Sequence, residues 1–355
     1  MRVAIVNDLK LAQLALRRLI ESAEDGEVAW VAEDGEQAIA RCAQDVPDLI
    51  LMDLVMPNVD GVEATRRIMQ ESPCPILVVT ATVEGNLSKV YHALGAGALD
   101  AVSGPTFAED GTLQDAGPVL KKMNTMRRLM KPVPELDTLR RRSSSGAFPP
   151  PTQPAERLVV IGASTGGPQA VVDVINGLGG SFRPPVIVVQ HLDAAFVPGF
   201  VKWLGSQTGW PARAIEVGDA PEPGTIQVAA GGNHLVMGLT RRMRYEEEPA
   251  DLAYRPSVDV FLLSLKRNWP TPGVAVLLTG MGQDGAKGMV KLKERGWATL
   301  AQDEASSVVY GMPKAAAELG GTTAIVSLAD MGRRVEAAWS RLAATAEASG
   351  PEGSV

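Results

Sequence analysis

The chain has 355 residues, of which 45% are hydrophobic and 21% are charged, and its formal net charge is −7. This length favours two domains in a soluble globular protein. A negative net charge argues against nucleic acid as a partner, and no apolar run approaches the roughly 20 residues that a membrane span requires. We therefore expect a cytoplasmic protein that binds no nucleic acid and inserts into no membrane.

The first 107 or so residues alternate between strand and helix patterns. Short apolar runs rich in branched side chains predict five strands, at residues 3–6, 28–32, 49–52, 76–79 and 99–102. Helical spacing of the apolar residues predicts helices between them, at residues 11–22, 36–44, 62–69 and 87–94. Strands that alternate with helices imply parallel crossovers, so we expect an α/β fold with a doubly wound parallel sheet.

At the carboxyl ends of three of these strands lie polar residues that suit phosphate chemistry. Asp8 follows the first strand, Asp53 follows the third, and Thr80 follows the fourth. Two carboxylates in close approach favour a hard divalent cation such as Mg²⁺, and an aspartate beside Mg²⁺ can accept a phosphoryl group. Taken alone, Asp8 fits a helix cap equally well.

The residues around Asp53 resemble a known signalling domain. The run Leu-Met-Asp-Leu-Val-Met-Pro at 51–57, with Asp-Gly at 60–61 and Thr-Ala at 80–81, is similar to the receiver domain of response regulators. The resemblance implies that Asp53 is the phosphoacceptor. It also implies that Asp8, Asp53 and the Val55 carbonyl bind the Mg²⁺ needed for phosphorylation. Thr80 would be the hydroxyl that follows the phosphoryl group.

Three positions depart from the receiver pattern. Asn7 stands where family members carry a second acid, Gly104 replaces a lysine before proline, and Ala101 replaces an aromatic residue. Loss of the lysine removes a charge-assisted contact worth on the order of 1.5–3 kcal/mol. Lys10 is a candidate to compensate. These departures leave open how phosphorylation would be transmitted.

Composition changes after the first domain. A helical pattern at 119–130 is followed by a segment rich in Arg, Ser and Pro, which has too few apolar residues to fold. We expect a receiver domain at 1–118, a helix and flexible linker at 119–156, a second domain at 157–346 and a disordered tail at 347–355. The linker's run of three arginines fits a solvated hinge or a contact with an acidic partner.

Only two cysteines occur, Cys42 and Cys74. They are too few to form a metal cluster, which favours a reducing compartment. Cys42 lies at a helical spacing typical of a core residue. Cys74 lies between two prolines with no histidine nearby, so a catalytic thiol is not expected there.

Three apolar runs in the second domain each end in a residue that a serine hydrolase needs. The runs at 158–161, 186–189 and 274–278 lead to Ser164, His191 and Asp284 respectively. Continuously apolar runs predict strands buried in a parallel sheet, whose carboxyl ends gather ligands and catalytic groups. We expect Ser164 as nucleophile, His191 as base and Asp284 as the acid that orients it. His234, which follows Gly-Gly-Asn, is a competing base.

The glycine-rich segment 162–168, Gly-Ala-Ser-Thr-Gly-Gly-Pro, also fits a loop that binds phosphate. It lacks the lysine of a P-loop, the spacing of a dinucleotide fingerprint and the Gly-x-Ser-x-Gly elbow of the common hydrolase fold. Taken alone, it favours neither catalysis nor phosphate binding. Together with His191 and Asp284, it favours catalysis.

The second domain resembles the catalytic domain of chemotaxis protein-glutamate methylesterases. The resemblance rests on segments 162–168, 190–191, 254–259 and 279–285. It implies a Rossmann-like domain behind a flavodoxin-like receiver, and a triad of Ser164, His191 and Asp284. Backbone N–H groups of Thr165 and Met281 would form the oxyanion hole. Arg255 would lie at the substrate face, although a structural salt bridge explains it equally well.

The function implied is hydrolysis of glutamate γ-methyl esters on the cytoplasmic helices of chemoreceptors, with deamidation of glutamines by the same chemistry. No metal or other cofactor is needed for the ester. A histidine kinase would phosphorylate the receiver, which would gate the active site. Two other classes stay open: a non-catalytic signalling module and a small-molecule esterase. The output could also be something other than flagellar rotation.

Overall fold

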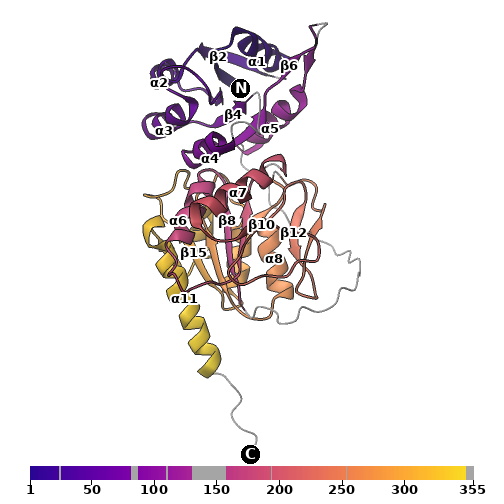
Figure 1. The fold of residues 1–355 in the computed structure, drawn as a ribbon, viewed down its shortest axis with the longest axis vertical. Helices are drawn as coiled ribbons and strands as arrows, with labels where there is room; N and C mark the ends of the chain where they lie inside the picture. The colour runs from indigo at the N-terminus through magenta and orange to yellow at the C-terminus, as the bar shows by residue number, and fades with distance from the viewer. Residues whose placement is uncertain are drawn as a thin grey trace, which may run out of the picture. The chain divides into compact units, whose positions relative to one another are not determined.

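The computed structural model describes residues 1–23, 25–80, 87–108, 111–129, 157–192, 194–252 and 254–348. The chain divides into two compact units, Met1–Pro134 and Glu135–Val355 (Figure 1). Of the predicted helix and linker at 119–156, residues 130–156 lie outside the described residues, as do residues 349–355 of the predicted tail.

The first unit is built on a five-stranded parallel sheet in the order β2-β1-β3-β4-β5. Its strands are β1 (Arg2–Val6), β2 (Glu27–Ala32), β3 (Leu49–Met52), β4 (Ile76–Thr80) and β5 (Asp100–Ser103). Every residue of β3 and β4 is buried, as expected where helices cover both faces of a sheet. The predicted α/β fold with parallel strands is confirmed.

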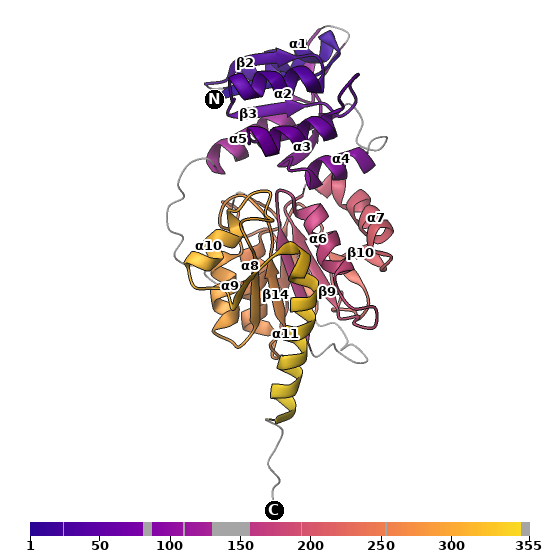
Figure 2. The same cartoon turned by 90° about the vertical axis from the view of Figure 1, so that its left-hand side faces the viewer.

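Helices connect the strands of the first unit, and two of them begin at capping aspartates. The helices are α1 (Lys10–Ser22), α2 (Gly35–Gln44), α3 (Gly61–Glu71), α4 (Leu87–Gly95) and α5 (Ala116–Leu129). Carboxylates of Asp34 and Asp60 accept N–H groups in the first turns of α2 and α3. Figure 2 shows α2 and α3 side by side, and α3 also contacts α4.

One feature of the first unit was not predicted. A short antiparallel pair, β6 (Thr106–Phe107) and β7 (Leu113–Gln114), lies between β5 and α5. Strands of two residues carry too little alternation to be detected in a sequence. The following helix begins at Ala116, ahead of the expected residue 119.

The second unit is built on a seven-stranded parallel sheet in the order β10-β11-β9-β8-β14-β15-β16. Its strands are β8 (Val159–Ala163), β9 (Val186–Gln190), β10 (Ala212–Ala214), β11 (Ile226–Val228), β14 (Val274–Leu277), β15 (Ala298–Gln302) and β16 (Ala324–Val326). A separate antiparallel pair consists of β12 (His234–Met237) and β13 (Met243–Glu246). All three strands that were predicted to carry catalytic residues are central neighbours, in the order β9-β8-β14.

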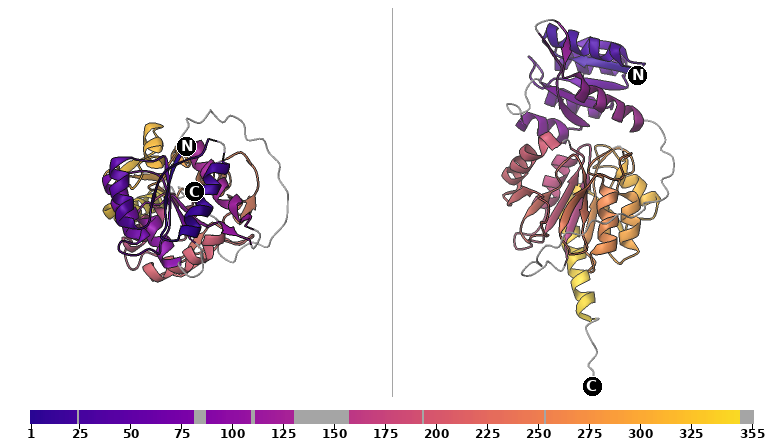
Figure 3. Two further views of the ribbon diagram at one scale, coloured as in Figure 1. Left: turned by 90° about the horizontal axis from the view of Figure 1, so that it is seen from above. Right: turned by 90° about the vertical axis from the view of Figure 1, so that its right-hand side faces the viewer.

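Helices line the sheet of the second unit, as the views in Figure 3 show. They are α6 (Gly167–Asn176), α7 (Val197–Thr208), α8 (Val258–Asn268), α9 (Ala286–Lys293), α10 (Met312–Glu318) and α11 (Leu328–Ala348), with one 3₁₀ turn, Ala194–Phe196. Helix α6 contacts α7 and α11, and α9 contacts α8 and α10. Helix α11 continues past residue 346, where the domain was expected to end. Within the described ranges, no helix is both long and apolar enough to cross a membrane.

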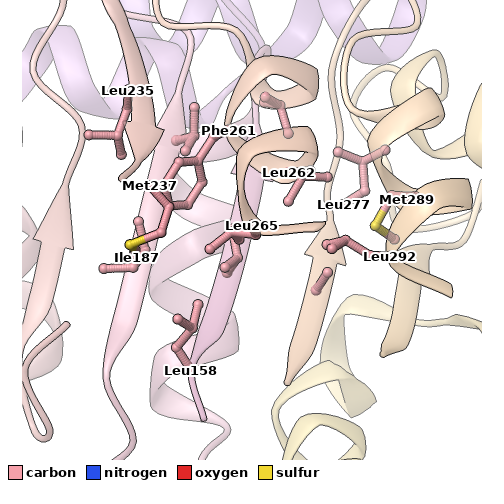
Figure 4. Close-up of a cluster of buried hydrophobic side chains, with 14 of the residues drawn as sticks. Leu158, Ile187, Leu235, Met237, Phe261, Leu262, Leu265, Leu277, Met289 and Leu292 are labelled. Carbon is pink, nitrogen blue, oxygen red and sulfur yellow. The ribbon is translucent and has the colours of Figure 1, made fainter. Parts of the chain in front are cut away.

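The core that fixes α8 lies between that helix, the sheet and α9 (Figure 4). Phe261, Leu262 and Leu265 of α8 are at most 2% exposed. Burial of each such side chain stabilises the fold by about 1.5–3 kcal/mol. The amino end of α8 is thereby held in a fixed position, and this end reaches the candidate active site.

Candidate active site

The catalytic candidates stand directly after three neighbouring strands. Ser164 follows β8 and His191 follows β9, while Asp284 lies in the loop after β14. Backbone hydrogen bonds join these loops: Ser164 N donates to Thr279 O at 3.0 Å, and His191 N donates to Ala163 O at 3.1 Å. The predicted convergence on one rim of the sheet is therefore present in the structure.

The loop of Ser164 is shaped by glycines on both sides of it. Gly166 has a φ of 73°, a left-handed conformation that other residues rarely adopt. A Cβ at Gly167 would lie 2.2 Å from the side-chain oxygen of Gln190, and one at Gly280 would lie 2.8 Å from the Ser164 Cβ. A larger residue at either position would displace the serine loop, which is itself only 3% exposed at Ser164.

His191 is held by a carboxylate on one side and an aromatic ring on one face. Its Nε2 lies 2.7 Å from Asp284 Oδ2. The imidazole stacks on Tyr254 with ring centroids 4.0 Å apart and an angle of 10° between the planes. Nδ1 is buried and has no hydrogen-bond partner among the described residues. The nitrogen beside Asp284 therefore carries the proton, and Nδ1 is free to accept one.

Asp284 is held at the amino end of α8. Its carboxylate accepts hydrogen bonds from Ser257 Oγ at 2.8 Å, Val258 N at 2.7 Å and Asp259 N at 3.0 Å, besides that from His191. Burial alone would raise the pKa of Asp284, but the hydrogen bond and charge of His191, with these other donors, hold its pKa below the ordinary value. The group is thus kept ionised, as an acid that orients a histidine must be.

The competing base, His234, has both ring nitrogens engaged. Its Nε2 lies 3.0 Å from the Pro249 carbonyl, and its Nδ1 accepts the N–H of Ser257 at 3.1 Å. The residue is fully buried, and this burial lowers its pKa. Because neither nitrogen is available to a substrate, the geometry favours His191 as the base. His234 instead supports the segment of Ser257.

Thr165 and Met281 each place a backbone N–H group in the loops of this rim. Among the described residues, neither Thr165 N nor Met281 N donates a hydrogen bond. Their loops are nevertheless fixed, because Thr279 Oγ1 donates to the Thr165 carbonyl at 2.9 Å and the Gly280 carbonyl accepts Met312 N at 2.9 Å. Two free donors on fixed loops are what an oxyanion hole requires.

Arg255 and Tyr254 belong to the same sequence motif. The Arg255 guanidinium donates to the Ala250 carbonyl, and none of the ion pairs formed among the described residues includes it. In the sequence, Tyr254 is notable only as part of that motif. Its stacking on His191 depends on a contact between distant segments, which no local signal in the sequence reveals.

The first unit places Asp53 at the carboxyl end of β3. Its carboxylate accepts Asn7 Nδ2 at 3.0 Å and Leu54 N at 2.6 Å. Burial raises the pKa of Asp53 and the charge of Asp8 adds to the rise, while hydrogen bonds from the backbone N–H groups of Leu54 and Val55 and the charge of Lys89 oppose it. Asn7 thus occupies the place of the missing acid as a hydrogen-bond donor to Asp53.

Two lysines lie near the acidic residues of the first unit. Lys10, the candidate to compensate for the missing lysine, is exposed and pairs with Glu33. Lys89 of α4 pairs instead with Asp60 at 3.1 Å, and Gly61 packs directly against the backbone of Asp53. Ala101 and Thr80 are buried, and the Gly104 N–H donates to the Thr80 carbonyl at 3.0 Å.

The donors expected for Mg²⁺ are two carboxylates, Asp8 and Asp53, and the carbonyl of the exposed residue Val55. The Asp8 charge disfavours ionisation of Asp53, and a cation between them would relieve this repulsion. Hard oxygen donors of this kind suit Mg²⁺. No group of three or more His, Cys, Asp or Glu residues in the described part of the chain is placed to hold a metal.

Comparison with known proteins identifies both units. A family model for the CheB methylesterase matches residues 159–335, and a model for the response regulator receiver domain matches residues 3–114. The chain is 48% identical over 337 residues to the protein-glutamate methylesterase/protein-glutamine glutaminase of Mesorhizobium japonicum, which covers 94% of this chain and 98% of that protein. A protein with the same name from Cupriavidus pinatubonensis, numbered 1, is 46% identical over 339 residues, covering 94% and 96%.

Among solved structures, the catalytic domain of the Thermotoga maritima CheB methylesterase is 31% identical, with a TM-score of 0.48, and covers 50% of this chain and 96% of that one. The family assignment does not depend on this structure, because the identity to full-length relatives is high along nearly the whole chain. The resemblance inferred from the sequence motifs is therefore confirmed. This chain belongs to the protein-glutamate methylesterase/protein-glutamine glutaminase family, with a receiver domain ahead of a CheB methylesterase domain.

Proposed function

We propose that this chain hydrolyses glutamate γ-methyl esters on chemoreceptors through Ser164, and that it deamidates glutamines by the same route. The observation that carries the proposal is the state of His191. One ring nitrogen is bound to the ionised Asp284, and the other, on the rim that carries Ser164, is buried and has no hydrogen-bond partner among the described residues, Ser164 included. A base in this state can take a proton from a hydroxyl that comes within hydrogen-bond reach of it.

In the first half of the reaction, His191 Nδ1 takes the proton from Ser164 as Oγ attacks the ester carbonyl. The negative charge on the carbonyl oxygen is held by the N–H groups of Thr165 and Met281. Protonated His191 then gives its proton to the leaving methoxide, and methanol departs. Asp284 stabilises the imidazolium while it exists.

In the second half, the same base activates a water molecule, which attacks the glutamyl ester of Ser164. The acyl bond breaks, the serine hydroxyl recovers its proton from His191, and a glutamate carboxylate is released. With a glutamine side chain the leaving group is ammonia, and the later steps are the same. Apart from the substrate and water, the proposed steps use only groups of this chain. Arg255 is proposed to lie at the substrate face.

We further propose that the receiver controls this reaction in the cytoplasm. Asp53 would accept a phosphoryl group from a histidine kinase, and Thr80 would contact that group. Asp8, Asp53 and the Val55 carbonyl would hold Mg²⁺, which neutralises charge on the phosphoryl oxygens when bound. The domain limits proposed for this arrangement are residues 1–118 and 157–346, joined by the segment 119–156.

The substrate is tested by offering the purified chain three compounds: receptor membranes methylated at glutamate, the same membranes with glutamine at those sites, and a nitrophenyl ester. We expect methanol from the first, ammonia from the second and little turnover of the third. Turnover of the nitrophenyl ester alone would support a small-molecule esterase. No turnover of any of them would support a non-catalytic module.

A further inference from the structure

The two cysteines of this chain meet in the core of the receiver unit. Cys42 lies in α2 and Cys74 just before β4, so they are 32 positions apart in the sequence, yet their sulfur atoms are 3.8 Å from each other. Cys42 is fully buried and Cys74 is 5% exposed. Neither thiol has a role in ester hydrolysis or in phosphorylation of Asp53. The proposed function therefore does not account for the contact between the two thiols.

The surroundings of the pair favour reaction of one sulfur with the other. The hydrogen bond between the thiols lowers the pKa of Cys42, although burial opposes this, and the same contact raises the pKa of Cys74. A thiolate is the reactive form of cysteine. Cys74 also lies outside any strand or helix, beside the exposed Pro73, so its backbone is not held in the sheet.

We propose that Cys42 and Cys74 are a modification site, at which a peroxide converts the two thiols into an intramolecular disulfide. The sulfurs must approach from 3.8 Å to about 2.05 Å. The bond would link the carboxyl-terminal turn of α2 to the segment that precedes β4. The ring closed in this way contains β3, Asp53 and the whole of α3.

The reaction with hydrogen peroxide balances without another reactant. The thiolate of one cysteine attacks a peroxide oxygen, the O–O bond breaks, and a sulfenic acid forms as hydroxide leaves and is protonated to water. The second sulfur then attacks the sulfenic sulfur, the S–O bond breaks, and a second water forms with the proton of the second thiol. Two thiols are thereby oxidised by two electrons, and one peroxide is reduced to two waters.

The full-length protein is treated with hydrogen peroxide, unfolded in the presence of an alkylating reagent, and measured by intact mass and by peptide mapping. We expect loss of two hydrogen atoms, loss of both alkylation sites, and a peptide pair joined through Cys42 and Cys74. Dithiothreitol should restore both thiols. The receiver unit should also unfold at a higher temperature in the oxidised protein than in the reduced protein, because the disulfide lowers the conformational entropy of the unfolded chain.

Matched controls are Cys42→Ser and Cys74→Ser, each of which leaves one thiol without its partner. Neither variant should lose two hydrogen atoms. The result on the wild-type chain is decisive even if a variant fails to fold. Two thiols that remain alkylatable under peroxide that oxidises dithiothreitol would overturn the proposal. Sulfinic or sulfonic products, or disulfides only between chains, would also overturn it.

Discussion

Tyr254 limits the motion of the catalytic histidine. A single hydrogen bond to Asp284 fixes one atom of the imidazole, and the stacked Tyr254 ring, 4.0 Å away and nearly parallel, restricts rotation of its plane. We therefore expect Tyr254 to act as a positioning residue, through its ring rather than its hydroxyl.

We expect Tyr254→Ala to lower kcat for methanol release by about tenfold with a smaller change in KM, since a loosened base affects the chemical step. Tyr254→Phe keeps the stacked ring and should retain most of kcat. Initial rates on methylated receptor over a range of substrate concentrations measure both constants. If the Phe variant loses as much kcat as the Ala variant, stacking is not the important contact.

Asp259 is a second, partly buried acid beside the site, and its titration should make the free energy of unfolding depend on pH. Burial, with the adjacent Asp284 charge, raises the pKa of Asp259 to about 7. The folded protein then keeps a proton that the unfolded chain releases above about pH 4. The free energy of unfolding should therefore fall as the pH rises from about 4 to about 7, and level off above that.

In the wild type, Gly288 N donates to the Asp259 carboxylate at 2.7 Å. Asp259→Asn removes the titration and keeps an oxygen that can accept this hydrogen bond. We expect the variant to unfold at a higher temperature than the wild type, by a margin that grows between pH 4 and pH 7. Below pH 4 the two should coincide. Thermal unfolding of both proteins from pH 3.5 to pH 8 measures the margin. A margin that does not change with pH would contradict the raised pKa.

At the scale of elements, the amino end of α8 connects the hydrophobic core to Asp284. The helix is fixed by its apolar face, and its first turn supplies two N–H groups to Asp284. Ser257 caps the same turn: its Oγ donates to Asp284 at 2.8 Å and accepts Val260 N at 3.3 Å. One hydroxyl therefore serves both the stability of the helix and the position of the acid.

We expect Ser257→Ala to reduce the free energy of unfolding by about 1–2 kcal/mol and kcat by roughly tenfold, because the cap and a donor to Asp284 are lost together. Ser257→Thr keeps the hydroxyl and should recover most of both. Ser340→Ala removes an exposed hydroxyl from α11, remote in sequence from the catalytic loops, and serves as the control. Denaturant unfolding and initial rates distinguish the outcomes, and an Ala variant of full activity would contradict the role given to Ser257.

Helix α4 carries a lysine whose charge acts on Asp53. Lys89, bound to Asp60, is close enough to Asp53 for its charge to lower the pKa of that acid, whereas Lys10 pairs with Glu33. We expect Lys89→Ala to weaken binding of beryllofluoride with Mg²⁺ by about tenfold, as loss of one charge-assisted contact implies. Lys10→Ala should leave binding unchanged. A larger loss for Lys10→Ala, measured by titration of the full-length protein, would reverse the assignment.

At the scale of the whole molecule, the features that repeat along the chain were the predictable ones. Branched apolar runs disclosed the sheet strands that carry the site, and the rule that ligands gather at carboxyl ends of parallel strands brought Ser164, His191 and Asp284 together. Contacts across the fold could not be predicted in this way. The stacking of Tyr254, the support of Asp284 by α8 and the meeting of Cys42 with Cys74 each join segments whose separation in sequence carries no periodic signal.

Because the chain divides into two units, catalysis and its regulation can be considered separately. The receiver departs from its family pattern at Gly104 and Ala101, while Ser164, His191 and Asp284 follow neighbouring strands of the second unit. Hydrolysis by Ser164 and control by Asp53 are therefore separate claims. A single assay can test both, because one variant removes the nucleophile and a phosphodonor acts only through the receiver.

That assay measures methanol release from methylated receptor membranes by the full-length protein, with and without a small phosphodonor. We predict release that increases with the phosphodonor and falls by at least about 10⁴-fold in Ser164→Ala. Release from Ser164→Ala at the wild-type rate would contradict the central claim that this serine is the nucleophile. A Ser164-dependent rate that ignores the phosphodonor would keep the enzyme and contradict only its control by Asp53.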